Sequence, residues 1–146
     1  MKPCYLFDID GTLADCSHRL HHIQKSPKDW RAFFAACDDD APIAPVISLL
    51  LALFDADHTI VYVSGRSDEC RALTHDWMMR HSLPDAPLYM RKEGDYRNDD
   101  IVKGELLDQI LADGFNPVMA FDDRDRVVKM WRDRGIHCAQ VASGDF

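Results

Sequence analysis

The chain has 146 residues, of which 47% are hydrophobic and 29% charged, enough for one domain with an ordinary globular core. Its formal net charge of −8 argues against a general nucleic-acid-binding protein, because such proteins depend on Lys and Arg to neutralise phosphates. No apolar run is long enough to span a membrane, no signal peptide is visible, and the five cysteines are scattered without a CxxC pair. We therefore expect no membrane association, and a cytoplasmic protein with reduced thiols.

Strand-like and helix-like segments alternate along most of the chain. This alternation predicts βαβ units, and hence an α/β fold with a parallel sheet and helices on its faces. Because no repeat or linker is visible, we expect residues 1–146 to form one domain. Gly114, Asn116 and Pro117 predict a turn before one strand. In chain order, we expect a strand at 4–9, a helix at 43–56, a strand at 59–64, a helix at 68–81, a short strand at 88–90, a helix at 99–113, a strand at 118–122, a helix at 124–135 and a strand at 137–142.

Residues 15–41 do not fit this alternation. Within them, "KDWRAFFAAC" predicts a helix that begins near Pro27 and ends in the acidic run from Asp38 to Asp40. Ligands of open α/β sheets bind at the carboxyl ends of the strands, and this segment directly follows the first strand. We therefore expect it to form a small cap, or lid, over the site.

Unusual polar residues follow three of the predicted strands and occur early in one helix. Each has an ordinary explanation when taken alone, since "SGR" is often a turn, "DD" often caps a helix, and a lone lysine is usually solvated. Together, at the same edge of the sheet, they favour a ligand site. The set consists of Asp8 and Asp10 after the first strand, Ser64, Gly65 and Arg66 after the second, Asp122 and Asp123 after "VMAF", and Lys103 in the helix that begins near Asp99.

The pair Asp8 and Asp10 is the most informative feature. In a strand, alternate side chains point to the same side, so these two carboxylates would lie close together. Two such carboxylates repel each other unless a cation or a shared proton compensates. One carboxylate can attack phosphorus while the other manages protons, and hard oxygen ligands of this kind suit Mg²⁺. We therefore expect phosphoryl transfer around a shared metal ion.

Four motifs resemble those of the haloacid dehalogenase phosphohydrolase superfamily. They are "DIDGT", "VSGRS", the lysine of "DIVKGE" and "FDDRD", in the order found in that superfamily. "GDYRNDDIVK" and the C-terminal "FDDRDRVVKMWRDRGIHCAQVASGDF" also resemble the 3′-phosphatase half of phage polynucleotide kinase/phosphatases. No GxxxxGK[ST] motif of the kinase half is present. The resemblance implies a Rossmann-like, free-standing phosphatase domain of the phage type.

The resemblance also implies roles for the acidic residues. Asp8 would be the nucleophile that forms an aspartyl-phosphate, and Asp10 the general acid/base, whose backbone carbonyl also binds Mg²⁺. Asp123 would be the direct metal ligand and Asp122 its supporting partner, although the order within this pair could be reversed.

The remaining motif residues would serve the phosphate group. The resemblance implies that Thr12, Ser64 and Lys103 contact the phosphate, and the amide of Gly65 can hold a phosphate oxygen. Lys103 would also act in catalysis, as a positive charge beside the nucleophile and the phosphate. Arg66 would orient the site or touch the substrate.

Three groups of side chains near the cap have two interpretations each. The histidines could form a second metal site or a polar face of the cap. The aromatic residues could stack on a nucleobase or anchor the cap to the body, and the basic residues could form a rim beside the site or a solvated loop. The histidines are His18, His21 and His22, the aromatic residues Trp30, Phe33 and Phe34, and the basic residues Arg91, Lys92 and Arg97.

Three functions remain open. The first is Mg²⁺-dependent hydrolysis of 3′-phosphates at DNA or RNA ends, with only shallow contact to the polynucleotide. The second is hydrolysis of small phosphate esters such as nucleotides or sugar phosphates, which the net charge of −8 favours. The third is a non-catalytic metal-binding or phosphate-binding subunit. A separate kinase or ligase is a possible partner.

Overall fold

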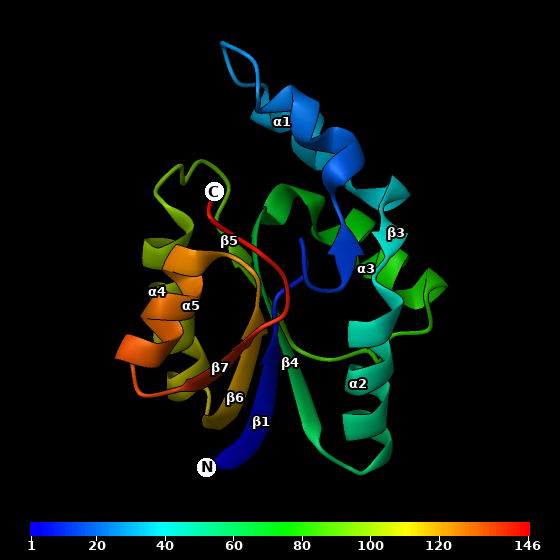
Figure 1. Cartoon of the computed structure of the whole chain (residues 1–146). Coiled ribbons are helices and arrows are strands. Elements are labelled where there is room, and N and C mark those ends of the chain that lie inside the picture. Colours follow the sequence, from blue (N-terminus) through cyan, green and yellow to red (C-terminus); the bar gives the residue numbers. More distant parts are fainter.

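Five parallel strands form a single sheet at the centre of the molecule (Figure 1), in the computed structural model, which describes residues 1–146. The order across the sheet is β5-β4-β1-β6-β7, so β1 is central. This confirms the predicted α/β fold with a parallel sheet. The strands are β1 (Lys2–Phe7), β4 (Thr59–Ser67), β5 (Leu88–Arg91), β6 (Phe115–Asp122) and β7 (His137–Gln140).

Helices cover both faces of the sheet (Figure 1), as the prediction of a doubly covered sheet requires. On one face, α4 (Asp99–Ala112) and α5 (Asp125–Asp133) enclose a core that includes Trp131. On the other face, α2 (Ala44–Asp55) and α3 (Arg71–Arg80), the latter preceded by a 3₁₀ turn, enclose a core that includes Trp77. Apolar side chains on both sides of β1 therefore hold the carboxyl end of this strand rigidly between two cores.

Several strand boundaries differ from the predicted ones. β1 begins at Lys2 rather than at residue 4, β4 continues to Ser67 rather than ending at residue 64, and β7 ends at Gln140 rather than at residue 142. β1 ends at Phe7 rather than at residue 9, so Asp8 and Asp10 follow the strand instead of belonging to it. β6 begins at Phe115, so the predicted turn at Pro117 is wrong. The pairing of β6 with β1 shifts by one residue beside Pro117, because proline has no N–H to donate to the ladder.

Residues 15–41 lie beyond the carboxyl end of β1 (Figure 1). Two short antiparallel strands, β2 (Ala14–Asp15) and β3 (Ala41–Pro42), join the ends of this segment. The predicted helix is shorter than expected, because α1 (Trp30–Ala35) begins only after Asp29, whose carboxylate accepts the N–H of Ala32. Two 3₁₀ helices, η1 (Ser17–His22) and η2 (Cys37–Asp39), complete the segment.

None of the helices combines the length and the apolar character that crossing a membrane requires.

Candidate active site

A tight turn directly after β1 positions Asp8. The N–H of Asp8 still donates to the carbonyl of Phe121 in β6 (3.0 Å), and the N–H of Thr12 then donates to the carbonyl of Ile9 (3.1 Å). Gly11 completes this turn with φ +80°, and a Cβ at this position would lie 2.1 Å from an oxygen of Asp123. Glycine is therefore required here both for the backbone conformation and for room beside Asp123.

The Asp8 carboxylate is almost completely buried and has one partner for each oxygen. The hydroxyl of Thr12 donates to Oδ2 (2.9 Å), and the ammonium of Lys103 donates to Oδ1 (2.8 Å). Lys103 belongs to α4 and also donates to Oδ2 of Asp122 (2.9 Å). The lysine thus bridges the ends of the neighbouring strands β1 and β6.

Asp122 and Asp123 differ in how far their carboxylates are already occupied. Besides Lys103, Trp131 donates its indole N–H to Asp122 Oδ2 (3.1 Å), and the backbone N–H of Asp123 donates to Asp122 Oδ1 (2.9 Å). No N–H group of the protein donates to the buried Asp123 carboxylate, which leaves its oxygens available for a cation.

Oxygen atoms from Asp8, Asp122 and Asp123 lie within 4.8 Å of one another. Burial raises the pKa of Asp8 well above its usual value, and Asp122 adds to this although Lys103 opposes it. Burial likewise raises the pKa of Asp123 to about 6. Burial alone would lower the pKa of Lys103, but Asp122 and Asp8 raise it, so the ammonium stays charged. One ammonium does not neutralise three buried carboxylates, and a hard divalent cation such as Mg²⁺ fits this oxygen set.

Asp10 is held by a separate set of cations. Its carboxylate is about a quarter exposed, and Oδ1 accepts from Arg66 Nη2 (2.6 Å), from Arg66 Nε (3.0 Å) and from Arg19 Nη2 (2.6 Å). Burial alone would raise the pKa of Asp10, but Arg66 and Arg19 more than offset this effect, so the pKa is lowered. Asp8 and Asp10 both lie beyond the end of β1, so the alternation of side chains along a strand does not pair them. Each carboxylate instead has its own basic partners, Lys103 for Asp8 and the two arginines for Asp10.

Two buried residues of this site, Arg19 and Asp40, were missed by the sequence analysis. Asp40 accepts from Arg19 Nε and Nη2 (2.8 Å each) and from Arg66 Nη2 (3.0 Å), while its backbone carbonyl accepts from Trp77. Nothing local marks either residue, since Asp40 ends an acidic run and Arg19 lies in a polar stretch. Asp10, Arg19, Asp40 and Arg66 together are called the arginine network below.

The residues predicted to follow the second strand instead lie within the last part of β4, which continues to Ser67. Ser64 is buried, and its hydroxyl accepts the backbone N–H of Arg66 (3.0 Å). A Cβ at Gly65 would lie 2.5 Å from the Asp99 carboxylate at the start of α4. The backbone of β4 therefore packs directly against the helix that carries Lys103.

The predicted basic rim is wrong for Arg91, which is buried and donates to the Gly65 carbonyl (2.7 Å). Arg97 is engaged by Asp95 and Glu105, which leaves Lys92 as the one exposed member without an ion pair.

The three histidines do not form a metal cluster with one another. His18 contacts Asp40 (2.6 Å), whereas the rings of His21 and His22 pack together with centroids 3.9 Å apart. The only group of three metal-ligating side chains is the aspartate set at the ends of β1 and β6.

The fold and sequence are similar to those of known polynucleotide-processing proteins. The chain matches a solved structure of the Pnkp1/Rnl/Hen1 complex over its full length, with a TM-score of 0.86 and 28% identity, covering 48% of that protein. A structure of the Pnkp1/Rnl/Hen1 RNA repair complex gives a TM-score of 0.84 and 27% identity over 100% of the chain and 44% of that protein. A protein of Autographa californica nuclear polyhedrosis virus, named as a bifunctional polynucleotide kinase/RNA ligase, is 30% identical over 129 residues. This match covers 88% of the chain and 17% of the viral protein.

The chain therefore spans less than half the length of each of these relatives. A family model described as the phosphatase domain of the polynucleotide kinase PNKP matches residues 2–146, nearly the whole chain. The match confirms the resemblance found in the sequence motifs, and the protein belongs to the family of PNKP phosphatase domains, within the haloacid dehalogenase-type phosphatases.

Proposed function

We propose that this phosphatase domain removes 3′-phosphates from polynucleotide ends, with Asp8 as the nucleophile and Mg²⁺ as the cofactor. The observation that supports the proposal best is the position of Lys103, which donates to both Asp8 and Asp122 beside the free carboxylate of Asp123. This arrangement combines a buried nucleophile, a fixed positive charge and a cation site at one edge of the sheet.

Hydrolysis would proceed in two steps. An oxygen of Asp8 attacks phosphorus, the bond from phosphorus to the 3′ oxygen breaks, and the leaving oxygen takes up a proton. Water then attacks the aspartyl-phosphate, loses a proton, and releases inorganic phosphate and the Asp8 carboxylate. Thr12 and Lys103 orient the Asp8 carboxylate, and the positive charge of Lys103 opposes the rise in its pKa that burial causes. Lys103 and Ser64 are the proposed contacts of the phosphate oxygens.

Asp10 is the proposed proton donor and acceptor, and the arginine network restricts this role. Because Arg19 and Arg66 lower its pKa, the Asp10 carboxyl is held in its ionised form while it contacts them and has no proton to donate. Proton donation therefore requires the Asp10 carboxylate to leave these arginines. Residues 15–41 supply Arg19, so a movement of this proposed cap would couple substrate binding to the protonation of Asp10.

In the bound state, Asp8, Asp123 and the backbone carbonyl of Asp10 would hold Mg²⁺, with Asp122 in support. The ion would supply positive charge that offsets the repulsion between the carboxylates and the phosphate dianion.

The proposed substrate follows from the relatives. Their names refer to polynucleotide kinases, RNA ligases and RNA repair, which favours 3′-phosphorylated ends of RNA or DNA. A separate kinase or ligase would then act on the ends that this phosphatase prepares. The net charge of −8 favours the competing function, hydrolysis of small phosphate esters.

A substrate panel tests the proposal. It contains a 3′-phosphorylated RNA and DNA oligonucleotide, their 5′-phosphorylated isomers, a nucleoside monophosphate and a sugar phosphate, each with Mg²⁺ or with a chelator. We expect the highest kcat/KM for the 3′-phosphorylated oligonucleotides, and no turnover with the chelator. Equal values for all substrates would instead identify a phosphatase of small molecules.

A further inference from the structure

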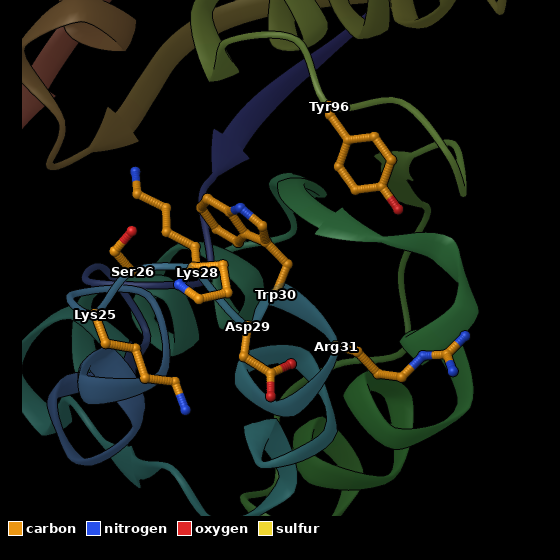
Figure 2. A pocket seen from close by; sticks show the side chains of 8 residues that line it. Lys25, Ser26, Lys28, Asp29, Trp30, Arg31 and Tyr96 are labelled. Carbon is orange, nitrogen blue, oxygen red and sulfur yellow. The ribbon is translucent and has the colours of Figure 1, made fainter.

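A cleft of about 590 Å³ lies between the 15–41 segment and the loop that joins β5 to α4. Residues 25–31 form one wall and Tyr96 the other. Figure 2 shows the rings of Trp30 and Tyr96 on opposite sides of the opening, with the Lys28 side chain beside Trp30. We call this space the cap cleft; none of its residues belongs to the aspartate cluster or to the arginine network.

The Trp30 wall is built to hold one indole ring in a fixed orientation. Phe34 stacks on the ring with centroids 5.9 Å apart, and Phe33 contacts it edge-on at 5.8 Å. Phe33 is itself buried, whereas 37% of Trp30 remains exposed. Part of a large aromatic surface is therefore left open toward solvent on a rigid support.

The Tyr96 wall is an exposed ring on a fixed backbone. Tyr96 is 79% exposed, so its ring contributes almost nothing to the core. The carbonyls of its two neighbours, Asp95 and Arg97, both accept from Arg91 Nη1, at 3.0 and 2.6 Å. An ordered loop thus presents an unpacked aromatic side chain, which is typical of a binding residue.

The charge of the cap cleft is opposite to that of the whole chain. Lys25, Lys28 and Arg31 line it, and the only acidic side chain, Asp29, is occupied as the N-cap of α1. The ammonium of Lys28 lies 5.8 Å from the centre of the Trp30 ring. In Figure 2, Lys25 and Arg31 extend from the two ends of this wall. An anionic ligand with flat groups fits these surroundings.

Each wall of the cap cleft contacts residues near the carboxyl ends of β1 and β4, where the proposed active site lies. On the cap side, Arg19 lies over the Phe33 ring, 4.3 Å from its centroid, and donates to Asp10. On the loop side, Arg91 donates to the carbonyl of Gly65 and pairs with Asp99. A ligand bound in the cap cleft would therefore contact the two segments whose arginines reach Asp10 and the end of β4.

We propose that the cap cleft binds the single-stranded nucleotides next to the reacting 3′-phosphate, with one base stacked between Trp30 and Tyr96 and the phosphodiesters near Lys25, Lys28 and Arg31. The ligand class is single-stranded polynucleotide, because it combines flat bases with an anionic backbone. The proposal rests on the proposed function and specifies how the substrate strand is recognised.

The first test compares substrates of different size. The measured quantity is the ratio of kcat/KM for a 3′-phosphorylated hexanucleotide to that for p-nitrophenyl phosphate. We expect Trp30→Ala and Tyr96→Ala each to lower this ratio about 5- to 50-fold, as loss of a stacking partner does, and Trp30→Phe to restore most of it. Phe54→Ala, which removes a similarly exposed ring at the end of α2, is the matched control and should leave the ratio unchanged.

The second test needs no turnover. Trp77 and Trp131 are buried, so quenching of fluorescence by a 3′-hydroxyl oligonucleotide reports on Trp30. We expect quenching in the wild type, weaker quenching in Tyr96→Ala and none in Trp30→Phe. RNA and DNA oligonucleotides are titrated separately to show which backbone binds better.

The two proposals fail in different ways. If the wild type does not favour 3′-phosphorylated oligonucleotides but Trp30 is still quenched, the proposed function is wrong and the cap cleft is a nucleic-acid site. If the preference is present but both alanine variants keep ratios within about twofold of the wild type and no quenching occurs, the cap cleft is not the subsite.

Discussion

At the scale of single residues, the site is organised by which carboxylates have basic partners and which do not. Lys103 forms ion pairs with Asp8 and Asp122, and Arg19 and Arg66 both form ion pairs with Asp10. Asp123 has no such partner of its own. The predicted functional differences between these four aspartates follow from this distribution of cations.

Replacement of Asp8 by asparagine should abolish turnover without unfolding the protein. The amide cannot attack phosphorus, yet its oxygen can still accept from Lys103 and its NH₂ group can contact the Thr12 hydroxyl. Single-turnover assays should show loss of the phosphorylated enzyme, and circular dichroism should show an unchanged fold. A rate above about a tenth of the wild-type value would contradict the aspartyl-phosphate mechanism.

Asp10→Asn should retain more activity than Asp8→Asn. Loss of a general acid/base costs on the order of a hundredfold or more, whereas loss of the nucleophile removes the covalent step itself. The measurement is the steady-state rate with two esters that differ in leaving group. A good leaving group needs little protonation, so an ester such as p-nitrophenyl phosphate should show a smaller defect than an alkyl phosphate. The assignment of Asp10 fails if both esters show the same defect.

Asp123→Asn should raise the Mg²⁺ concentration needed for half-maximal activity more than Asp122→Asn does. The Asp123 oxygens are free to bind the ion, whereas those of Asp122 are occupied by Lys103, Trp131 and a backbone N–H. A Mg²⁺ titration of activity measures the difference. Identical titration curves for the two variants would remove the support for this assignment.

At the scale of the elements, the arginine network joins the 15–41 segment to the body. Arg19 comes from η1, Asp40 follows η2, and Arg66 lies in β4. Their side chains are fully buried, so the charges depend on one another rather than on water. This connection makes the position of the proposed cap sensitive to any single member.

Asp40→Asn should therefore destabilise the protein by about 3 kcal/mol, because two buried guanidinium groups lose one of their two carboxylates. Urea unfolding followed by circular dichroism measures the change. The matched control is Asp39→Asn, an exposed neighbour in η2, which should change the free energy of unfolding by less than about 0.5 kcal/mol. Equal effects of the two substitutions would show that the network contributes no stability.

At the scale of the whole molecule, the excess of buried carboxylates over cations at the aspartate cluster should link the proposed metal binding to pH. The folded-state pKa values of Asp8 and Asp123 lie above the ordinary carboxyl value, so the metal-free folded protein binds more protons than the unfolded chain between about pH 4 and pH 6. This contribution to stability is present at low pH and is lost as the pH rises through the folded-state pKa values. Mg²⁺ bound as proposed would displace these protons, so its stabilising effect should grow with pH.

The increase in Tm caused by saturating Mg²⁺ should therefore be small near pH 5 and larger near pH 8. Differential scanning fluorimetry with Mg²⁺ or with a chelator measures this increase. In Asp123→Asn the pH dependence should be weaker, because one of the titrating ligands is gone. An increase in Tm that does not vary with pH would mean that protons and metal do not compete at this site.

The net charge of −8 and the small number of basic residues in the cap cleft also predict that only a few nucleotides of a long substrate are bound. Three basic residues line the cap cleft, so few phosphates are neutralised, and the expected slope of log kcat/KM against log salt is no steeper than about −2. Oligonucleotides of about six and about thirty residues should then be processed at similar rates. A slope much steeper than this, or a strong preference for the long strand, would point to a larger basic surface.

The alternation of strands and helices and the four motifs were enough to predict the parallel sheet and the family, because both depend on local patterns of residues. The arginine network and the cap cleft were decided only by the tertiary structure. Asp40 contacts arginines 21 and 26 residues away, and neither partner has a sequence pattern that marks the pairing. In the sequence, nothing distinguishes Tyr96 from other tyrosines in polar loops. Only in the folded structure do the hydrogen bonds of Arg91 fix its loop, so that Tyr96 lines the same cleft as Trp30. Contacts of this kind depend on how separate elements pack, and no periodicity within one element records them.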